Sequence, residues 1–256
     1  MREPLLAVEK ISKHFGGIAA LHQVSFTMAP DRIQGLIGPN GAGKTTLFNL
    51  VSGVFRPNDG VIRYHDQPIH HLAPHQIAQL GIARTFQNVR LFSNLSVLEN
   101  VMVGGSARHR AGVFADALRL PHTARAETAC RRHAEELLDF VGLGGDAALP
   151  AAALPFGRQR LLEIARALAT EPSLLLLDEP AAGLSIPERA DLVKLIKAIR
   201  ERGITVLLVE HDMGLVMKVC DTIVVLEFGI KIAEGTPEEI QKDPRVISAY
   251  LGEDHE

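Results

Sequence analysis

The chain has 256 residues, of which 46% are hydrophobic and 22% charged, with a formal net charge of −3 at pH 7. This composition is that of an ordinary globular protein and excludes disordered, collagenous and coiled-coil chains. The near balance of 27 basic and 30 acidic side chains gives no general attraction to nucleic acid, so none is expected as a partner. Cys130 and Cys220 form neither a disulfide framework nor a metal-ligand pattern, which favours a reducing cytoplasm.

No stretch of the chain predicts a membrane-spanning helix. The most apolar run, Leu174–Leu177, has the length of a strand and falls far short of the roughly 20 apolar residues that a span requires. The first residues, Met1-Arg2-Glu3-Pro4, lack the basic-then-apolar layout of a signal peptide, so none is expected. If this protein works at a membrane, we expect it to do so through a partner.

Short apolar runs alternate with segments of helical periodicity, which indicates an α/β protein. The expected elements, in chain order, are strands at 5–8, 24–26 and 33–37, helices at 45–51, 96–102, 127–140 and 161–168, a strand at 174–177, a helix at 192–199 and a strand at 204–209. They predict a mostly parallel sheet with helices on both faces, preceded by an N-terminal antiparallel β subdomain. The mostly helical stretch 88–156 is expected to form a lobe inserted into a single domain spanning 1–256.

A glycine-rich segment between an expected strand and an expected helix fits the phosphate-loop pattern G-x-x-x-x-G-K-[ST]. It reads Gly38-Pro39-Asn40-Gly41-Ala42-Gly43-Lys44-Thr45. Glycines let the backbone wrap phosphates, and amides at the helix start direct partial positive charge at them. Lys44 would reach the β- and γ-phosphates, and the Thr45 hydroxyl would bind Mg²⁺. Chance alone gives such a match in only about one per cent of chains of this length, so we expect a nucleotide site here.

A second acidic site follows the apolar run Leu174–Leu177, where the sequence continues Asp178-Glu179-Pro180. Carboxylates at the C-terminal end of a buried strand lie where α/β sheets bind their ligands. Asp178 would hold Mg²⁺ through its water, and Glu179 could polarise an attacking water. A strand that merely ends in a polar turn would be the better interpretation of this segment alone. The phosphate loop earlier in the chain reverses that preference.

Three further motifs follow in a fixed order. They are Gln87 after the expected strand at 82–86, the run Leu154-Pro155-Phe156-Gly157-Arg158-Gln159-Arg160 before a helix, and His211 after a strand that ends at Glu210. With these motifs the chain resembles the ATPase subunits of ABC transporters over essentially its full length. The resemblance implies a P-loop NTPase core, ATP and Mg²⁺ as cofactors, and ATP hydrolysis that drives transport.

The resemblance also implies roles for individual residues. Gln87 would sense Mg²⁺ and the attacking water and face the transmembrane partner, and His211 would contact the γ-phosphate. Phe15 would stack on adenine, although taken alone it is more simply a core aromatic, and His211 alone a surface histidine. The implied catalytic residues are therefore Glu179, His211 and Gln87. Thr45, Gln87 and Asp178 would hold Mg²⁺, and nucleotide binding would use Phe15, Gly38, Pro39, Asn40, Gly41, Ala42, Gly43, Lys44, Thr45 and Thr46.

Finer matches resemble one branch of this family, the LivG-type subunits of branched-chain amino acid importers. The matching runs are 81–88, 91–92, 95–101, 181–184, 233–240 and 249–253. In that branch two different ATPase subunits, of LivG and LivF type, pair beneath two membrane permeases, and a periplasmic protein delivers the amino acid. The resemblance thus implies a heterodimer at the cytoplasmic face of the inner membrane, attached through the permeases. Each ATP would lie between two subunits and meet the partner's signature.

The chain departs from the family pattern at three places. The usual signature L-S-G-G-Q reads Leu154-Pro155-Phe156-Gly157-Arg158, and proline has neither the hydroxyl nor the amide that the serine offers to the γ-phosphate. The aspartate usual after Gly183-Leu184 is Ser185. The segment 107–132 carries six arginines; it could dock a partner, although a solvated face is the simpler interpretation.

Three neighbouring histidines do not predict a further metal site. His71 and His75 are four residues apart and His70 is adjacent, but no cysteine or acidic cluster joins them. Pro74 between them reads better as the first turn of a helix.

Two alternatives to a branched-chain amino acid importer stay open. One is the same enzyme with another cargo, such as urea or lipopolysaccharide. The other is a soluble ABC ATPase acting on a cytosolic assembly, or a regulatory nucleotide-binding module. Intact Glu179 and His211 favour turnover over regulation. The sequence does not predict the cargo, because this subunit would never touch it.

Overall fold

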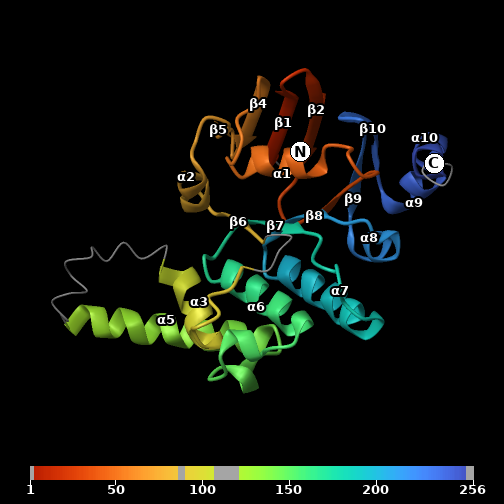
Figure 1. Cartoon of the computed structure of the whole chain (residues 1–256). Coiled ribbons are helices and arrows are strands. Elements are labelled where there is room, and N and C mark those ends of the chain that lie inside the picture. The colour runs from red at the N-terminus through yellow and green to blue at the C-terminus, as the bar shows by residue number, and fades with distance from the viewer. Residues whose placement is uncertain (1–2, 86–89, 107–120, 252–256) are drawn as a thin grey trace.

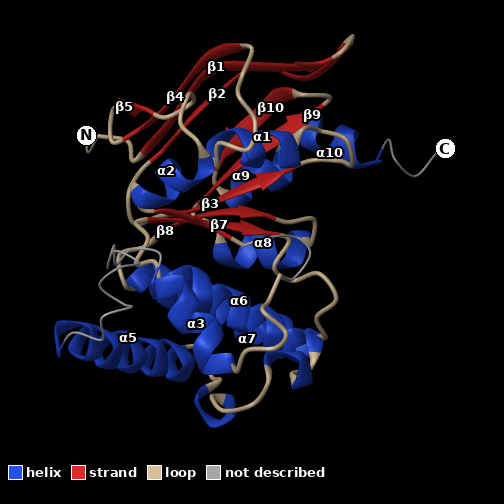
Figure 2. Cartoon of the chain, turned by 60° about the vertical axis from the view of Figure 1, so that its left-hand side comes forward, coloured by secondary structure: helices blue, strands red, loops and turns tan. Residues whose placement is uncertain are grey.

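The computed structural model describes residues 3–85, 90–106 and 121–251. In this part of the chain the strands form two stacked sheets (Figures 1 and 2). The first is antiparallel, in the order β2-β1-β4-β5, with β1 at Leu6–Phe15, β2 at Ile18–Met28, β4 at Asp59–Tyr64 and β5 at Gln67–Pro68. The second has the order β10-β9-β3-β8-β7-β6, with β3 at Ile33–Ile37, β6 at Ile82–Arg84, β7 at Leu174–Asp178, β8 at Thr205–Val209, β9 at Thr222–Glu227 and β10 at Ile230–Gly235. In this second sheet only β10 pairs antiparallel with its neighbour.

Helices fill the space around the second sheet. In chain order they are α1 (Lys44–Val51), α2 (Pro74–Gln79), α3 (Val97–Ser106), α5 (Pro121–Phe140), α6 (Phe156–Leu168), α7 (Ile186–Glu201), α8 (Met213–Val219), α9 (Pro237–Lys242) and α10 (Pro244–Leu251), with short 3₁₀ turns at Gly144–Asp146 and Ala151–Ala153. Figure 2 shows α1 between the two sheets and α6, α7 and α8 on the opposite face of the second sheet. Helices α3 and α5 lie beyond α6, furthest from the antiparallel sheet.

Strand β7 lies between two hydrophobic cores. Because successive side chains of a strand point to opposite faces, its four leucines divide between them. Leu174 and Leu176 pack with α1 and the antiparallel sheet. Leu175 and Leu177 pack with α6, α7 and the outer helices. All four are fully buried, as a parallel strand covered on both faces requires.

The segment before α3 is fixed by local hydrogen bonds. The Glu99 carboxylate accepts from Ser96 N and Ser96 Oγ, both at 2.8 Å, and so begins the helix. Asn100 is completely buried; its side chain accepts from Phe92 N at 2.9 Å and donates to Phe92 O at 3.0 Å. These contacts hold the chain that enters α3 against the helix itself.

The fold class expected from the sequence is confirmed: a mostly parallel core sheet, an antiparallel β subdomain and a helical layer. The expected strands at 5–8 and 24–26 are too short, since β1 and β2 span Leu6–Phe15 and Ile18–Met28. Exposed polar residues interrupt their apolar pattern because one face of the antiparallel sheet meets solvent. Pro74 does begin a helix, as expected. Among the described residues, no helix has both the length and the apolar character needed to cross a membrane.

Candidate functional site

The glycine-rich segment forms a loop between β3 and α1 that only glycine can build at two positions. Gly38 has φ +148°, and a Cβ there would collide with the carbonyl of Leu226. Gly43 has φ +100°, and a Cβ there would lie 2.7 Å from Ala20 O. The turn after β9 braces the loop, because Gly229 N donates to Ala42 O at 3.1 Å. The glycines are therefore required by close packing as well as by backbone conformation.

Lys44 holds the loop from within. Its Nζ donates to Gly38 O at 2.6 Å and to Pro39 O at 2.8 Å, and the residue is only 8% exposed. Helix α1 begins at this lysine, and no side chain caps its N-terminus. The first-turn amides and the exposed Thr45 are therefore available to a ligand that carries negative charge.

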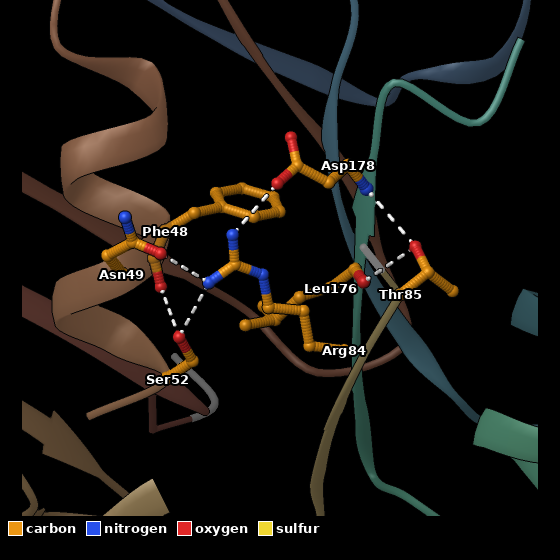
Figure 3. A network of polar contacts seen from close by, with 7 residues as sticks. All are labelled: Phe48, Asn49, Ser52, Arg84, Thr85, Leu176 and Asp178. Carbon is orange, nitrogen blue, oxygen red and sulfur yellow. Dashed lines mark hydrogen bonds and ion pairs between the residues drawn. The ribbon is translucent and has the colours of Figure 1, made fainter. Parts of the chain in front are cut away.

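The acidic pair lies at the same edge of the sheet. β3 and β7 are both parallel neighbours of β8, so their carboxyl ends meet there. Asp178 ends β7 and is 3% exposed, and its Oδ2 accepts from Arg84 Nη2 at 2.9 Å (Figure 3). Figure 3 shows the other carboxylate oxygen pointing away from the guanidinium. Asp178 can thus offer one oxygen to a further ligand.

Glu179 and His211, two of the expected catalytic residues, lie next to each other in the structure. Asp178 pairs with Val209 in the β7–β8 register, so the residues that follow each strand are neighbours. Glu179 Oε2 lies 3.9 Å from His211 Nδ1. Glu179 has φ +46°, an uncommon conformation for a residue other than glycine, and its backbone N donates to Val209 O at 2.9 Å. This fixed turn places a carboxylate and an imidazole side by side.

Phe15 is not a core residue. The residue is 43% exposed, and its ring packs edge-on against Phe55, with the ring centroids 5.2 Å apart. Lys13 Nζ lies 5.1 Å from the Phe15 centroid. An exposed ring of this kind is better suited to base stacking than to core packing. Its role in adenine binding stays a prediction. Gln87 lies outside the described residues.

The signature run is at the start of α6. Leu154 is buried, whereas Phe156 is 48% exposed. Pro155 occupies the N-cap position with an extended backbone and provides no side-chain cap. Arg158 forms an ion pair with Asp146 and donates from Nη2 to Gly142 O at 3.2 Å. The helix therefore presents an N-terminus that no side chain of the run caps.

Comparisons with known proteins agree with this geometry. The ABC transporter family model matches residues 21–182, and the model for the branched-chain amino acid ATP-binding cassette transporter matches residues 231–256. The high-affinity branched-chain amino acid transport ATP-binding protein LivG of Escherichia coli (strain K12) is 44% identical over 254 residues, which are 99% of this chain and 100% of that protein. BraF of Pseudomonas aeruginosa, with the same descriptive name, gives the same identity and coverage. The chain belongs to the LivG branch of the ABC transporter ATP-binding proteins.

Solved structures of the family share the fold. The ADP conformation of an ATP-binding cassette of an ABC transporter has a TM-score of 0.85 at 29% identity and covers 98% of this chain and 100% of its own. A nucleotide-free ATP-binding cassette from an ABC transporter has a TM-score of 0.84 at 29% identity, over 97% and 99% of the two chains. The whole described arrangement is thus that of an ATP-binding cassette.

The structure adds Glu210, which in the sequence marks only the end of an expected strand. This residue is 1% exposed and accepts from Ala181 N at 2.7 Å and from His211 N at 3.2 Å. Burial raises the pKa of its carboxyl group, and the backbone hydrogen bonds oppose that rise. Glu210 thereby ties the turn that carries Glu179 to the turn that carries His211. A charged residue directly after a fully buried strand was the signal that could have identified it.

Ser185, which replaces the usual aspartate, has a structural partner. Ser185 Oγ donates to Glu188 Oε2 at 2.6 Å, and Ser185 N donates to the same oxygen at 2.8 Å. These hydrogen bonds lower the pKa of the Glu188 carboxyl group. In this ATP-binding cassette the serine begins helix α7 by capping it.

The donor set at the sheet edge fits Mg²⁺. Thr45 offers an exposed hydroxyl at the start of α1. Asp178 offers the carboxylate oxygen that does not accept a hydrogen bond from Arg84. Mg²⁺ prefers such oxygen ligands and is held in nucleotide sites by one or two protein groups together with phosphates and waters.

Proposed function

We propose that this chain is the ATP-hydrolysing subunit of an importer for branched-chain amino acids. The decisive observation is that the phosphate loop, Asp178, Glu179 and His211 gather at one edge of the sheet in a chain that matches LivG along its full length. Residues 231–256 match the model specific to branched-chain amino acid transporters, which supports this cargo over urea or lipopolysaccharide.

The chemistry is positioning plus charge neutralisation. Lys44 would exchange its loop carbonyls for β- and γ-phosphate oxygens, and the α1 amides would hold the phosphates. Glu179 would accept a hydrogen bond from the attacking water and so orient that water. His211, beside Glu179, would contact the γ-phosphate. Thr45, Asp178 and Gln87 would hold Mg²⁺ together with ATP, and the ion would supply further neutralisation of phosphate charge. Phe15 would stack on the adenine ring.

The proposed assembly pairs this chain with a second, LivF-type ATPase beneath two permeases, to which a periplasmic protein delivers the cargo. The chain would then lie at the cytoplasmic face of the inner membrane. Its own ATP would meet the partner's signature, and its run Leu154-Pro155-Phe156-Gly157-Arg158 would meet the partner's ATP. Within this scheme we take 1–256 as one nucleotide-binding domain and 88–156 as its helical lobe.

A groove between α2 and the helical layer supports attachment to a permease. Its volume is about 580 Å³, and its walls include Val54, Ile77, Phe92 and Val103. Phe92 is 49% exposed, and the Arg166 guanidinium carbon lies 5.7 Å from its ring centroid. An apolar groove with a cationic rim suits a short helical segment of a membrane protein.

The test is purification of the tagged chain from solubilised membranes, followed by reconstitution of the complex in lipid vesicles. We expect a second ATPase and two permeases to co-purify. ATP hydrolysis should rise with the binding protein loaded with leucine, and not with urea. Lys44→Ala should abolish this activity because it removes the charge that faces the phosphates. Recovery of cytosolic proteins alone would support a soluble ABC ATPase instead.

A further inference from the structure

Arg84 lies where three elements of the nucleotide site meet. It is the last residue of β6, and its side chain is only 10% exposed. Nη2 donates to Asp178 Oδ2 on β7 at 2.9 Å, and Nη1 donates to Asn49 Oδ1 at 2.7 Å and to Ser52 Oγ at 2.9 Å (Figure 3). The guanidinium carbon is 5.6 Å from the ring centroid of Phe48. One side chain therefore joins β6, β7 and the C-terminal end of α1.

The ion pair fixes how Asp178 is presented. A carboxylate that is 3% exposed is costly to bury unless a cation or several donors compensate it. Arg84 supplies the cation and occupies Oδ2, so the side chain cannot rotate freely. Its other oxygen points away from the guanidinium (Figure 3). The pair thus selects the orientation in which one oxygen faces the edge of the sheet.

Arg84 also contacts α1, the helix that carries the other proposed Mg²⁺ ligand, Thr45. Helix α1 begins at Lys44 and carries Thr45 in its first turn, whereas Asn49 lies in its last turn and Ser52 is its C-cap. A guanidinium presents its donors in a rigid planar fork, so one arginine can bind the helix and the aspartate in a fixed relation. A lysine ammonium could pair with Asp178, but its single nitrogen could not reproduce that fork.

We propose that Arg84 is a positioning residue for Mg²⁺ binding. It holds Asp178 with one oxygen turned outward and ties α1, which carries Thr45, to β7, which carries Asp178. This inference rests on the Mg²⁺ site proposed above. Arg84 would thereby affect how much Mg²⁺ adds to nucleotide affinity, without itself contacting the metal or the nucleotide.

The test separates metal-dependent from metal-independent nucleotide binding. The dissociation constant of a fluorescent ATP analogue is measured with Mg²⁺ and with EDTA. The EDTA value divided by the Mg²⁺ value gives the metal's contribution to binding. For Arg84→Ala we expect this ratio to fall by about 10- to 100-fold, the usual effect of removing a group that orients a metal ligand. The EDTA value should stay unchanged. Arg63→Ala, which breaks the exposed pair of Arg63 Nε with Glu9 Oε1 at 3.3 Å, is the control and should leave both values unchanged.

Two further variants carry the test if Arg84→Ala does not fold, which a thermal melt will show. Arg84→Lys keeps a cation beside Asp178 but loses the fork, and Asn49→Ala combined with Ser52→Ala keeps the ion pair but loses the link to α1. Both should lower the ratio less than Arg84→Ala does. A parent-like ratio in all folded variants, or an equal change with Mg²⁺ and EDTA, would overturn the inference. A parent whose affinity ignores Mg²⁺ would instead refute the metal site itself.

Discussion

The carboxylate of Glu188 lies against the backbone of Gly157 at the start of α6. A Cβ placed on Gly157 would collide with Glu188 Oε1 and come within 2.9 Å of its Cδ. The first turn of α6 contains no acidic residue of its own, so Glu188 from α7 supplies negative charge at this N-terminus. In the proposed heterodimer the γ-phosphate of the partner's ATP would approach the same place. The signature run of this chain thus lacks the usual serine and has the Glu188 carboxylate next to it.

The first prediction concerns Pro155. In the Glu179→Gln background, which should retain ATP, Pro155→Ser should strengthen ATP-dependent dimerisation of the isolated chain. The serine hydroxyl would add a hydrogen bond to a charged phosphate, worth about 1.5–3 kcal/mol, or roughly 10- to 150-fold in the dimer dissociation constant. Sedimentation with and without ATP measures it. Tight dimerisation with Pro155 in place, or no gain from serine, would make the proline a neutral variant.

The second prediction concerns the adjacent charge. Glu188→Gln should strengthen the same ATP-dependent dimer by about 2- to 5-fold, the usual size of a charge effect at an exposed helix N-terminus. Glu239→Gln is a matched control, because Glu239 forms the same kind of capping contact with Thr236 at the start of α9. Equal effects of the two substitutions would show that the gain does not come from the signature helix.

The third prediction concerns turnover. Glu179→Gln should keep ATP affinity and lower the hydrolysis rate by about 10²- to 10⁴-fold, the range for losing a general base. The glutamine fits the fixed turn after β7 and keeps a polar contact with His211, so the fold should be undisturbed. Isothermal titration with ATP and single-turnover hydrolysis separate the two effects. Loss of binding together with turnover would give Glu179 a structural role.

Two parts of this site could be predicted from the sequence because each is contiguous. The loop at 38–45 and the strand that ends at Asp178 carry their own spacing, and adjacent parallel strands then bring His211 to Glu179. The contacts that connect these parts could not be predicted in this way. Arg84 and Asp178 are 94 residues apart, and Glu210 and Ala181 are 29 apart. No local pattern marks an arginine at a strand end as the partner of a distant carboxylate.

The full lengths of β1 and β2 could likewise not be predicted from the apolar pattern. Positions such as Lys10 and His22 lie on the solvent side of the antiparallel sheet and break the hydrophobic runs. Their strand conformation comes from pairing between β1, β2 and β4, which only the tertiary fold supplies.

The fourth prediction concerns thiol reactivity. Burial raises the pKa of Cys220 to about 12, so at pH 8 only about one thiol in 10⁴ is the reactive thiolate. The thiolate fraction of any thiol grows with pH, and the raised pKa keeps that of Cys220 small near neutral pH. Iodoacetamide should therefore leave Cys220 unmodified in the folded protein and label it in urea. Mass spectrometry of the alkylated peptides measures both. Rapid labelling of folded protein at Cys220 would contradict the burial described here.

The division of the β7 leucines between two cores has a consequence for cooperativity. Since Leu174 and Leu176 support one core and Leu175 and Leu177 the other, neither core can come apart without releasing the strand that ends at Asp178. Loss of packing in the outer helices would therefore reach the nucleotide site as directly as loss of packing around α1. By mass action, a nucleotide that binds only the native state stabilises both cores together. ATP bound at this edge of the sheet would therefore stabilise the outer helices as well as the layers around α1.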